Sequence, residues 1–300
     1  MMKVLRTPEE RFKNLPGFPY KSIYIDNLKG YEDLRMHYID EGPKESKEVF
    51  LCLHGQPTWA YLYRKMIPIF IEAGCRVVAP DFFGFGRSDK PVEEEIYTFH
   101  FHRNFLIAFI EHLDLKNITL VGQDWGGILG LTLPVDMPER ISRLLLMNTL
   151  LGTGDFQLTR GFLGFRDWVN KTPDLGAGRL ISRITPHLSA EESAAYDAPF
   201  PDIRYKAGVR RFPNLVPDNP EAPGALISQK SRDYLSNKWS GETFMAIGMV
   251  DPVLGPPVMN PLKELIKGCP EPYKVKEASH FVQEWGEDVA REALKSFGLT

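Results

Sequence analysis

The sequence predicts an α/β fold in which a mostly parallel central sheet has helices on both faces. Two observations indicate this class. Short apolar runs alternate with longer segments of helical periodicity, and several of the runs end in glycine-rich turns. A third observation indicates an insertion into this fold: the alternation stops at about residue 152 and resumes at about residue 239. The 300 residues are enough for one large domain with an insertion, or for two small domains.

The alternating part of the chain predicts the following elements in order. We expect strands at residues 20–26, 34–40, 49–53, 76–79, 118–121, 141–147, 243–249 and 273–276, and helices at residues 61–73, 98–113, 257–267 and 286–297. The first two strands alternate apolar and polar residues, as antiparallel strands do. The run VFLCL at 49–53 is apolar throughout, which is typical of a buried central strand.

Residues 153–238 predict a helical cap, inserted into a core domain made of residues 1–152 and 239–300. The insertion contains helical fragments at residues 160–170, 178–183 and 189–196. The last fragment begins with Ser189 and has Glu192 three residues later, which is a capping box. A proline-rich stretch follows it.

Composition excludes several classes of partner. The net charge of −3 and the sequence pI near 6.2 imply no basic face, so we expect no nucleic-acid partner. The longest apolar run, Phe105 to Ile110, is too short to cross a membrane, and no signal peptide is visible. Cys52, Cys75 and Cys269 are widely spaced and form neither a disulfide framework nor a zinc motif. We therefore expect a cytoplasmic protein without a membrane partner.

The strand at 118–121 leads into Gly122-Gln123-Asp124-Trp125-Gly126, a G-x-D-x-G turn followed by a helical pattern. This is the arrangement of the nucleophile elbow in the α/β-hydrolase fold. Its glycines are required because a Cβ on either side of such a strained turn would clash with neighbouring backbone. The alternative is an ordinary glycine-rich turn whose aspartate is stabilised by the helix dipole.

An aspartate at the centre of the elbow narrows the chemistry. A carboxylate is a poor acyl nucleophile, but it can displace a leaving group from an sp³ carbon or open an epoxide, which leaves an alkyl ester on the protein. A second step must hydrolyse that ester. The motif therefore indicates carbon–halogen or epoxide chemistry.

Two further residues complete a candidate triad. In this fold the nucleophile, acid and histidine follow one another along the chain, each at the carboxyl end of a strand. Asp251 follows the strand at 243–249, and His280 follows the strand at 273–276. The alternatives are a turn aspartate before proline and a capping or surface histidine.

Backbone and indole N–H groups are candidates for binding anions. His54-Gly55-Gln56-Pro57 follows the strand at 49–53, so the N–H groups of Gln56 and Trp125 are the predicted oxyanion donors. The indole N–H of Trp125 could hold a halide without an acceptor group interfering, or the ring could only pack the elbow helix on the sheet. His54 is expected to be structural.

Beyond these features, the chain resembles the haloalkane dehalogenases, particularly those with a QDWGG elbow. The resemblance rests on the leader Arg6-Thr7-Pro8 with Arg11-Phe12, HGQPTWAYLYR at 54–64, DFFGFGRSDKP at 81–91, YTFHFHRN at 97–104, QDWGGILGLTLP at 123–134, YDAPFPD at 196–202, AGVRRFP at 207–213 and HFVQEWGE at 280–287. It implies Asp124 as the nucleophile, His280 as the base, Asp251 as the partner of His280, and Trp125 as the first hydrogen-bond donor to the halide. It also implies a small halogenated aliphatic substrate, a halide ion as product, no cofactor, and a monomer or weak homo-oligomer.

Two positions depart from the family pattern. Gln56 stands where relatives usually carry glutamate, which we expect to be tolerated because the proposed donor is the backbone N–H. Phe165 stands where many relatives supply a second halide-binding tryptophan, and Ile184, the other place for such a donor, is also apolar. Trp168, three residues after Phe165, shares roughly the same helix face and either replaces the donor or only packs.

The predicted substrate pocket is apolar. Its expected residues are Ile128, Phe165, Phe212, Pro213, Val216, Val253, Leu254 and Phe281. Two other functions remain open: an epoxide hydrolase that activates its substrate with Tyr196, Tyr205 or Tyr234, and a non-catalytic binding protein. Against the first, Gln123 stands where epoxide hydrolases typically have histidine.

Overall fold

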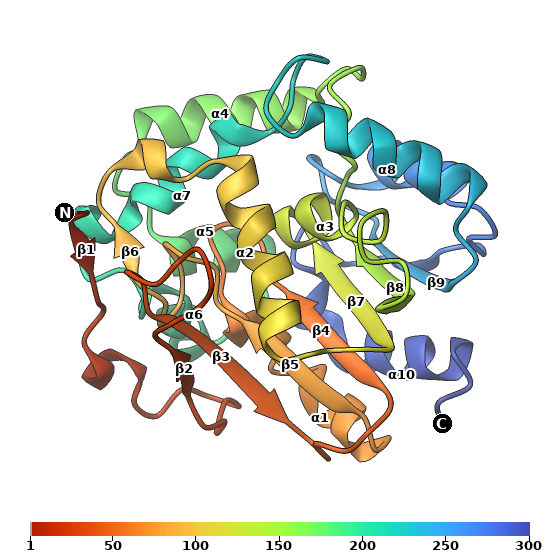
Figure 1. Ribbon diagram of the computed structural model, residues 1–300. Helices are drawn as coiled ribbons and strands as arrows, with labels where there is room; N and C mark the ends of the chain where they lie inside the picture. Colours follow the sequence, from red (N-terminus) through yellow and green to blue (C-terminus); the bar gives the residue numbers. More distant parts are fainter. Residues whose placement is uncertain (1) are drawn as a thin grey trace.

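An eight-stranded sheet runs through the centre of the protein in this computed structural model, which describes residues 2–300 (Figure 1). Its strands, in spatial order, are β10 (Tyr273–Val275), β9 (Glu242–Gly248), β8 (Ile141–Met147), β7 (Ile118–Gln123), β4 (Val49–Leu53), β5 (Arg76–Pro80), β3 (Met36–Glu41) and β2 (Ile23–Ile25). Only the pairings of β2 with β3 and of β3 with β5 are antiparallel. The mostly parallel sheet of the α/β-hydrolase fold is therefore confirmed. A separate two-stranded sheet pairs β1 (Val4–Leu5) with β6 (Lys90–Pro91), which the sequence did not predict.

Helices cover both faces of the sheet. The core helices are α1 (Ile67–Glu72), α2 (Phe99–His112), α3 (Trp125–Gly130), α9 (Pro256–Leu265) and α10 (Gly286–Ser296). In Figure 1, α2 and α3 lie on the near side of the sheet, while α1 and α10, which contact each other, lie on the other side.

Further helices fill the segment between β8 and β9. They are α4 (Arg160–Lys171), α5 (Ala177–Ile184), α6 (Ala190–Asp197), α7 (Ala207–Arg211) and α8 (Ala225–Asn237). The capping box of α6 forms as predicted, with Ser189 and Glu192 each bonding the other's backbone. The arrow of β7 in Figure 1 points toward α3 and the helices above it, so the carboxyl ends of the parallel strands face this segment.

Besides the sheet of β1 and β6 and helix α7, which the sequence did not predict, two stretches differ from the sequence prediction. The helix expected at residues 61–73 is divided into a 3₁₀ turn, η2 (Ala60–Tyr63), and α1. Pro68 occupies the second position of α1, where its missing N–H does no harm, so it favours the start of a new helix. Helix α8 was not predicted, and it begins directly after Gly224, whose φ of +94° is in the left-handed region.

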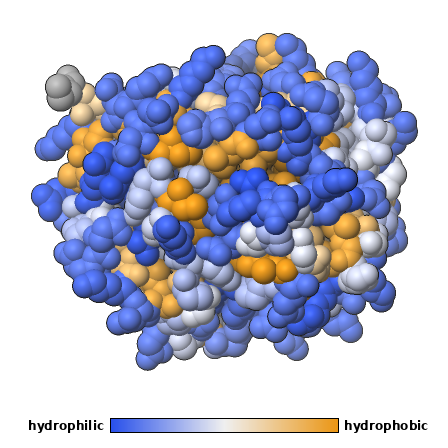
Figure 2. All heavy atoms as spheres, turned by 60° about the horizontal axis from the view of Figure 1, so that its bottom comes forward, coloured by the Kyte–Doolittle hydropathy of each residue, from blue (hydrophilic) through white to orange (hydrophobic). Residues whose placement is uncertain are grey.

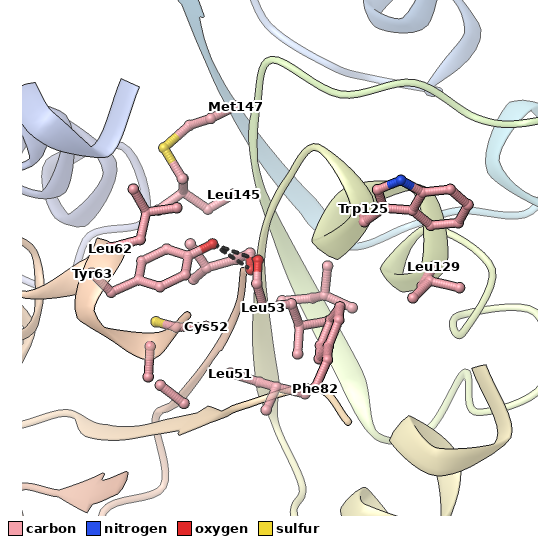
Figure 3. Packing of buried hydrophobic residues seen from close by; sticks show 14 of the residues in the cluster. Leu51, Cys52, Leu53, Leu62, Tyr63, Phe82, Trp125, Leu129, Leu145 and Met147 are labelled. Atoms are coloured by element: carbon pink, nitrogen blue, oxygen red, sulfur yellow. Dashed lines mark hydrogen bonds between the residues drawn. The ribbon is translucent and has the colours of Figure 1, made fainter. Parts of the chain in front are cut away.

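The core beside the elbow is apolar and fully packed. Leu51 and Leu53 of β4, Leu62 and Tyr63 of η2, and Leu145 of β8 are all inaccessible to solvent. Figure 3 shows the Tyr63 hydroxyl turned toward the backbone of Leu53, to which it donates a hydrogen bond of 2.6 Å. This contact holds the end of β4, where the loop containing Gln56 begins.

A buried arginine joins the core to α6. The guanidinium of Arg64, next to η2, donates two hydrogen bonds of 2.7 Å to Glu284, which lies just after the histidine loop. It also bonds Glu192 of α6 at 2.7 Å and the hydroxyl of Tyr196 at 3.2 Å. Because the two carboxylates come from different parts of the chain, Arg64 fixes α6 against the core.

The face of the molecule drawn in Figure 2 is predominantly hydrophilic. Figure 2 shows the underside of the view in Figure 1, where hydrophobic patches are separated by hydrophilic residues. Among the described residues, no helix combines the length and apolar character needed to span a bilayer.

Candidate active site

The elbow has the strained geometry that its sequence requires. Asp124 lies between β7 and α3 with φ of 50° and ψ of −128°, a conformation that non-glycine residues rarely adopt. A Cβ on Gly126 would lie 1.9 Å from the carbonyl oxygen of Leu53, and one on Gly122 would lie 2.8 Å from Cα of Gly127. Both flanking positions therefore require glycine, as expected.

One oxygen of Asp124 is held by a backbone donor. The N–H of Gln56 donates to Oδ1 of Asp124 at 2.8 Å. The N–H of Trp125 opens α3 and has no partner in a preceding turn. The side chain of Gln56 turns the other way, and its Nε2 donates to the carbonyl of Val209 in α7 at 3.1 Å. A glutamate at this position could not make that bond, because a carboxylate only accepts.

The structure brings the three predicted triad residues together. Nδ1 of His280 lies 2.9 Å from Oδ2 of Asp251, and because a carboxylate cannot donate, Nδ1 carries the proton. Nε2 of His280 lies 3.5 Å from Oδ2 of Asp124. The imidazole thus stands between the two carboxylates, with Nε2 turned toward the elbow.

Asn148 holds Asp251 in place, and the sequence analysis did not identify it. Its Nδ2 donates to Oδ2 of Asp251 at 2.8 Å, while its Oδ1 accepts the N–H of Gly248 at 2.8 Å. The N–H of Val253 donates to the other oxygen of Asp251, also at 2.8 Å. The available signal was position, because Asn148 directly follows β8 at the same edge of the sheet as the triad.

The charges of the triad stabilise one another. Burial opposes the charged imidazolium of His280, but Asp251 and Asp124 outweigh burial and raise the pKa of His280 to about 10. For Asp251, burial disfavours the charged carboxylate and alone would raise its pKa. The attraction of His280 and the hydrogen bonds from Asn148 and a backbone N–H instead hold the pKa of Asp251 below its ordinary value.

A cavity of about 440 Å³ lies over Asp124. Its lining comprises Gln56, Asp124, Trp125, Ile128, Leu150, Gly161, Phe162, Phe165, Trp168, Leu180, Arg183, Ile184, Pro213, Val216, Asp251, Pro252, Val253, Leu254, His280 and Phe281. All predicted pocket residues border it except Phe212. That side chain is fully buried and packs edge-on against Trp125, with ring centroids 4.9 Å apart, so it supports the indole from behind. The lining also includes residues that were not predicted: Leu150, Gly161, Phe162, Leu180, Arg183 and Pro252.

Two indole rings face this cavity. Trp125 is 3% exposed, and in Figure 3 its nitrogen lies on the edge of the ring turned away from Leu129. Trp168 is 39% exposed and lies beside Phe165, with ring centroids 6.1 Å apart. Within residues 2–300 neither indole N–H donates to a protein group, whereas that of Trp59 donates to Ala195 at 3.1 Å. Both cavity N–H groups are therefore available to a ligand.

Comparison with known proteins identifies the family. The profile of the alpha/beta hydrolase fold matches residues 48–287. A haloalkane dehalogenase from Psychrobacter cryohalolentis is 43% identical over 296 residues, which cover 97% of this chain and 96% of that protein. This chain belongs to the haloalkane dehalogenases. A second dehalogenase, from Mycolicibacterium paratuberculosis, is 41% identical over 285 residues and 94% of both chains.

A solved structure supports the same assignment. Haloalkane dehalogenase DpaA from Paraglaciecola agarilytica NO2, described as tetrameric, is 54% identical, has a TM-score of 0.97 and is matched over the whole of both chains. Dehalogenases are hydrolases that act on carbon–halide bonds. The tyrosines considered for an epoxide hydrolase, Tyr196, Tyr205 and Tyr234, do not line the cavity of this dehalogenase. In the described part of the chain, no group of three or more His, Cys, Asp or Glu side chains could hold a metal ion.

Proposed function

We propose that this dehalogenase hydrolyses haloalkanes in two steps through an alkyl ester on Asp124. The observation that carries the proposal is the position of the Asp124 carboxylate, between the N–H of Gln56 at 2.8 Å and Nε2 of His280 at 3.5 Å, in a mostly apolar cavity. Oδ1 of the carboxylate accepts the backbone N–H, and Oδ2, which faces His280 at the longer distance of 3.5 Å, is the oxygen that attacks an sp³ carbon. The apolar lining suits a haloalkane, which has no hydrogen-bonding group to satisfy.

In the first step, Oδ2 of Asp124 attacks the carbon in line with the carbon–halogen bond. The new C–O bond forms as the bonding pair leaves with the halogen, so a neutral ester and a halide ion result. The indole N–H of Trp125 is placed to donate to the developing halide, and a hydrogen bond to an anion contributes about 1.5–3 kcal/mol.

In the second step, His280 removes a proton from water, which attacks the ester carbonyl of Asp124. The oxyanion forms where Oδ1 now accepts the N–H of Gln56, with the N–H of Trp125 at the start of α3 as second donor. The imidazolium then protonates the departing alkoxide, so the alcohol leaves, and the carboxylate of Asp124 is restored as a proton is released.

The ester itself prepares the base for this second step. The charge and hydrogen bond of Asp124 contribute to the raised pKa of His280. Alkylation removes that charge, so the pKa of His280 falls once the ester has formed. The imidazolium can therefore release its proton once the ester has formed, and the neutral imidazole that accepts a proton from water becomes available only after the first step.

We propose Trp168 as the second halide donor in place of the missing tryptophan at position 165. The support is that Trp168 lines the cavity from α4 and that its indole N–H is unbonded among the described residues. Its exposure of 39% means that water competes for the halide, so we expect a weaker bond than at Trp125. Bromide binding, followed by tryptophan fluorescence, should weaken in Trp168→Phe and weaken more in Trp125→Phe. Unchanged affinity in Trp168→Phe would remove it from the halide site.

The test of the proposed function is bromide release from 1-bromobutane, with styrene oxide as the control substrate. Asp124→Asn should abolish bromide release, and His280→Phe should accumulate a protein heavier by one butyl group. Diol from styrene oxide without bromide from 1-bromobutane would instead indicate an epoxide hydrolase. Halide binding without any turnover would indicate a binding protein.

We further propose that residues 153–238 act as the cap domain over a core of residues 1–152 and 239–300. The support is that helices α4 to α8 fall in this segment and that α4 and α5, together with Pro213 and Val216, supply one side of the cavity. The relative described as tetrameric favours a homo-oligomer over a monomer for this chain. Light scattering coupled to size-exclusion chromatography would test the oligomeric state.

A further inference from the structure

Arg183 borders the active-site cavity and has no part in the two-step reaction. It lies in the last turn of α5, where Leu180, Arg183 and Ile184, spaced three and four positions apart, present one face to the cavity. Apart from the triad, it is the only ionisable residue in the lining. Because its side chain is exposed, it lies where the cavity meets solvent.

The guanidinium of Arg183 is unpaired. Across residues 2–300 it forms no ion pair, no hydrogen bond and no cation–π contact with a protein group. In contrast, Arg166 of α4 pairs with Asp218 at 3.0 Å, and Arg210 of α7 pairs with Glu94 at 2.5 Å. A cation at the end of a helix is favoured by the helix dipole, but the dipole does not explain why this one borders an apolar cavity.

A neutral haloalkane gives such a group nothing to bind. The five N–H donors of a guanidinium form a planar fork that matches the two oxygens of a carboxylate, and the guanidinium remains positively charged at every relevant pH. A substrate with its own carboxylate would be repelled by Asp124, and a cation at the rim would offset this repulsion. The chemistry of the rim therefore suits a haloalkyl chain with an anionic far end.

We propose that Arg183 forms an anion subsite that binds the terminal carboxylate of ω-haloalkanoates while their carbon–halogen bond lies at Asp124. This proposal rests on the proposed function, because it assumes that Asp124 is the nucleophile. The halide product is the other anion that Arg183 could meet, and the experiment separates the two.

The test compares 6-bromohexanoate with its methyl ester, which has the same haloalkyl chain and no charge. The measured quantity is the ratio of kcat/KM for the acid to kcat/KM for the ester. Arg183→Gln is compared with Arg179→Gln, because Arg179 lies one turn earlier on α5, is exposed and unpaired within the described chain, and does not line the cavity. Both variants remove one positive charge, so they change the overall field of the protein alike.

We expect the acid-to-ester ratio to fall about three- to tenfold in Arg183→Gln, in line with a partly exposed charge pair. The ratio should be unchanged in Arg179→Gln and partly restored in Arg183→Lys. Equal ratios in all variants would overturn the proposal. A lower kcat for both substrates, with altered bromide inhibition and the same ratio, would assign Arg183 to halide release instead and would also overturn it.

The subsite can be read separately from catalysis. If the wild-type protein hydrolyses neither substrate, the proposed function fails, and the affinity for hexanoate measured by calorimetry decides the subsite alone. We then expect hexanoate to bind the wild type at least about threefold more tightly than Arg183→Gln. Equal affinities would refute the subsite.

Discussion

Asn148→Ala tests how Asp251 is held, and the structure allows the cost to be worked out. The side chain of Asn148 is fully buried and makes hydrogen bonds to Oδ2 of Asp251 at 2.8 Å, to the carbonyl of Gly248 at 3.2 Å and from the N–H of Gly248 at 2.8 Å. One of these bonds is charge-assisted and two are neutral. Their loss should lower the free energy of unfolding by about 3–5 kcal/mol.

The same substitution should slow the second chemical step more than the first. Without Asn148, the pKa of Asp251 rises toward its ordinary value, and its support for the imidazolium of His280 weakens. We expect ester hydrolysis to slow about ten- to a hundredfold, which is less than the whole contribution of about 10²–10⁴ from a general base. Attack by Asp124 does not need the base and should change less.

Rapid quenching followed by mass spectrometry of the intact protein measures this directly. Asn148→Ala should accumulate the alkyl-enzyme during turnover of 1-bromobutane. Thr119→Val is the control, because Thr119 is buried in β7 and its hydroxyl has no hydrogen-bond partner within residues 2–300. If Asn148→Ala loses stability but shows no accumulated ester, Asn148 supports the fold alone, and the reasoning about Asp251 is refuted.

Four further outcomes follow from the structure. In Asp124→Asn the pKa of His280, followed by NMR, should fall below about 10, and an unchanged value would contradict the assigned cause. Because the pKa of His280 is higher in the folded state than the ordinary value of about 6.5, the protonated side chain stabilises the folded state fully below about pH 6.5. This stabilisation is lost as pH rises toward 10. Between these pH values, the free energy of unfolding measured in urea should therefore decline more in the wild type than in Asp124→Asn. Arg64→Ala should cost about 3–5 kcal/mol of unfolding free energy, because the buried carboxylate of Glu284 loses both of its hydrogen bonds to the guanidinium and keeps only Lys65, at 3.1 Å, as a cationic partner. A loss below about 1 kcal/mol in urea would refute this. Gly126→Ala should prevent normal folding. Gly164→Ala should raise the free energy of unfolding by about 0.5–1 kcal/mol, because the space around its Cβ in α4 is open. Equal melting temperatures of these two variants would contradict the steric argument.

The triad was readable from the sequence because its geometry follows from strand ends. Asp124 and Asp251 follow apolar strands and His280 follows the short strand β10, and parallel strands end at one edge of the sheet, so we expected their side chains to converge there. Asn148 has the same kind of position, but an amide after a strand is also a common turn residue, and only its contact with Asp251 distinguishes it.

The contribution of residues 153–238 was less predictable, because their helices contact the site through tertiary packing. Phe212 was expected in the pocket, yet it packs behind Trp125, since the short 3₁₀ turn η5 (Phe212–Leu215) directs it inward. Arg183 was missed because an arginine in a polar helix ordinarily faces water. Which face of α5 borders the cavity depends on how α4 and α5 lie, and no local pattern specifies that arrangement.

The hydrogen bond from the side chain of Gln56 to α7 restricts how residues 153–238 of this enzyme can be exchanged with the same segment of a relative. The residue that presents the backbone N–H to Asp124 also donates through its side chain to the carbonyl of Val209. A loop with glutamate at this position would meet that carbonyl with an acceptor, so two acceptors would face each other. A chimaera that joins this cap to a glutamate-bearing core should therefore misplace the oxyanion donor, and a compensating change in the loop should be needed to recover it.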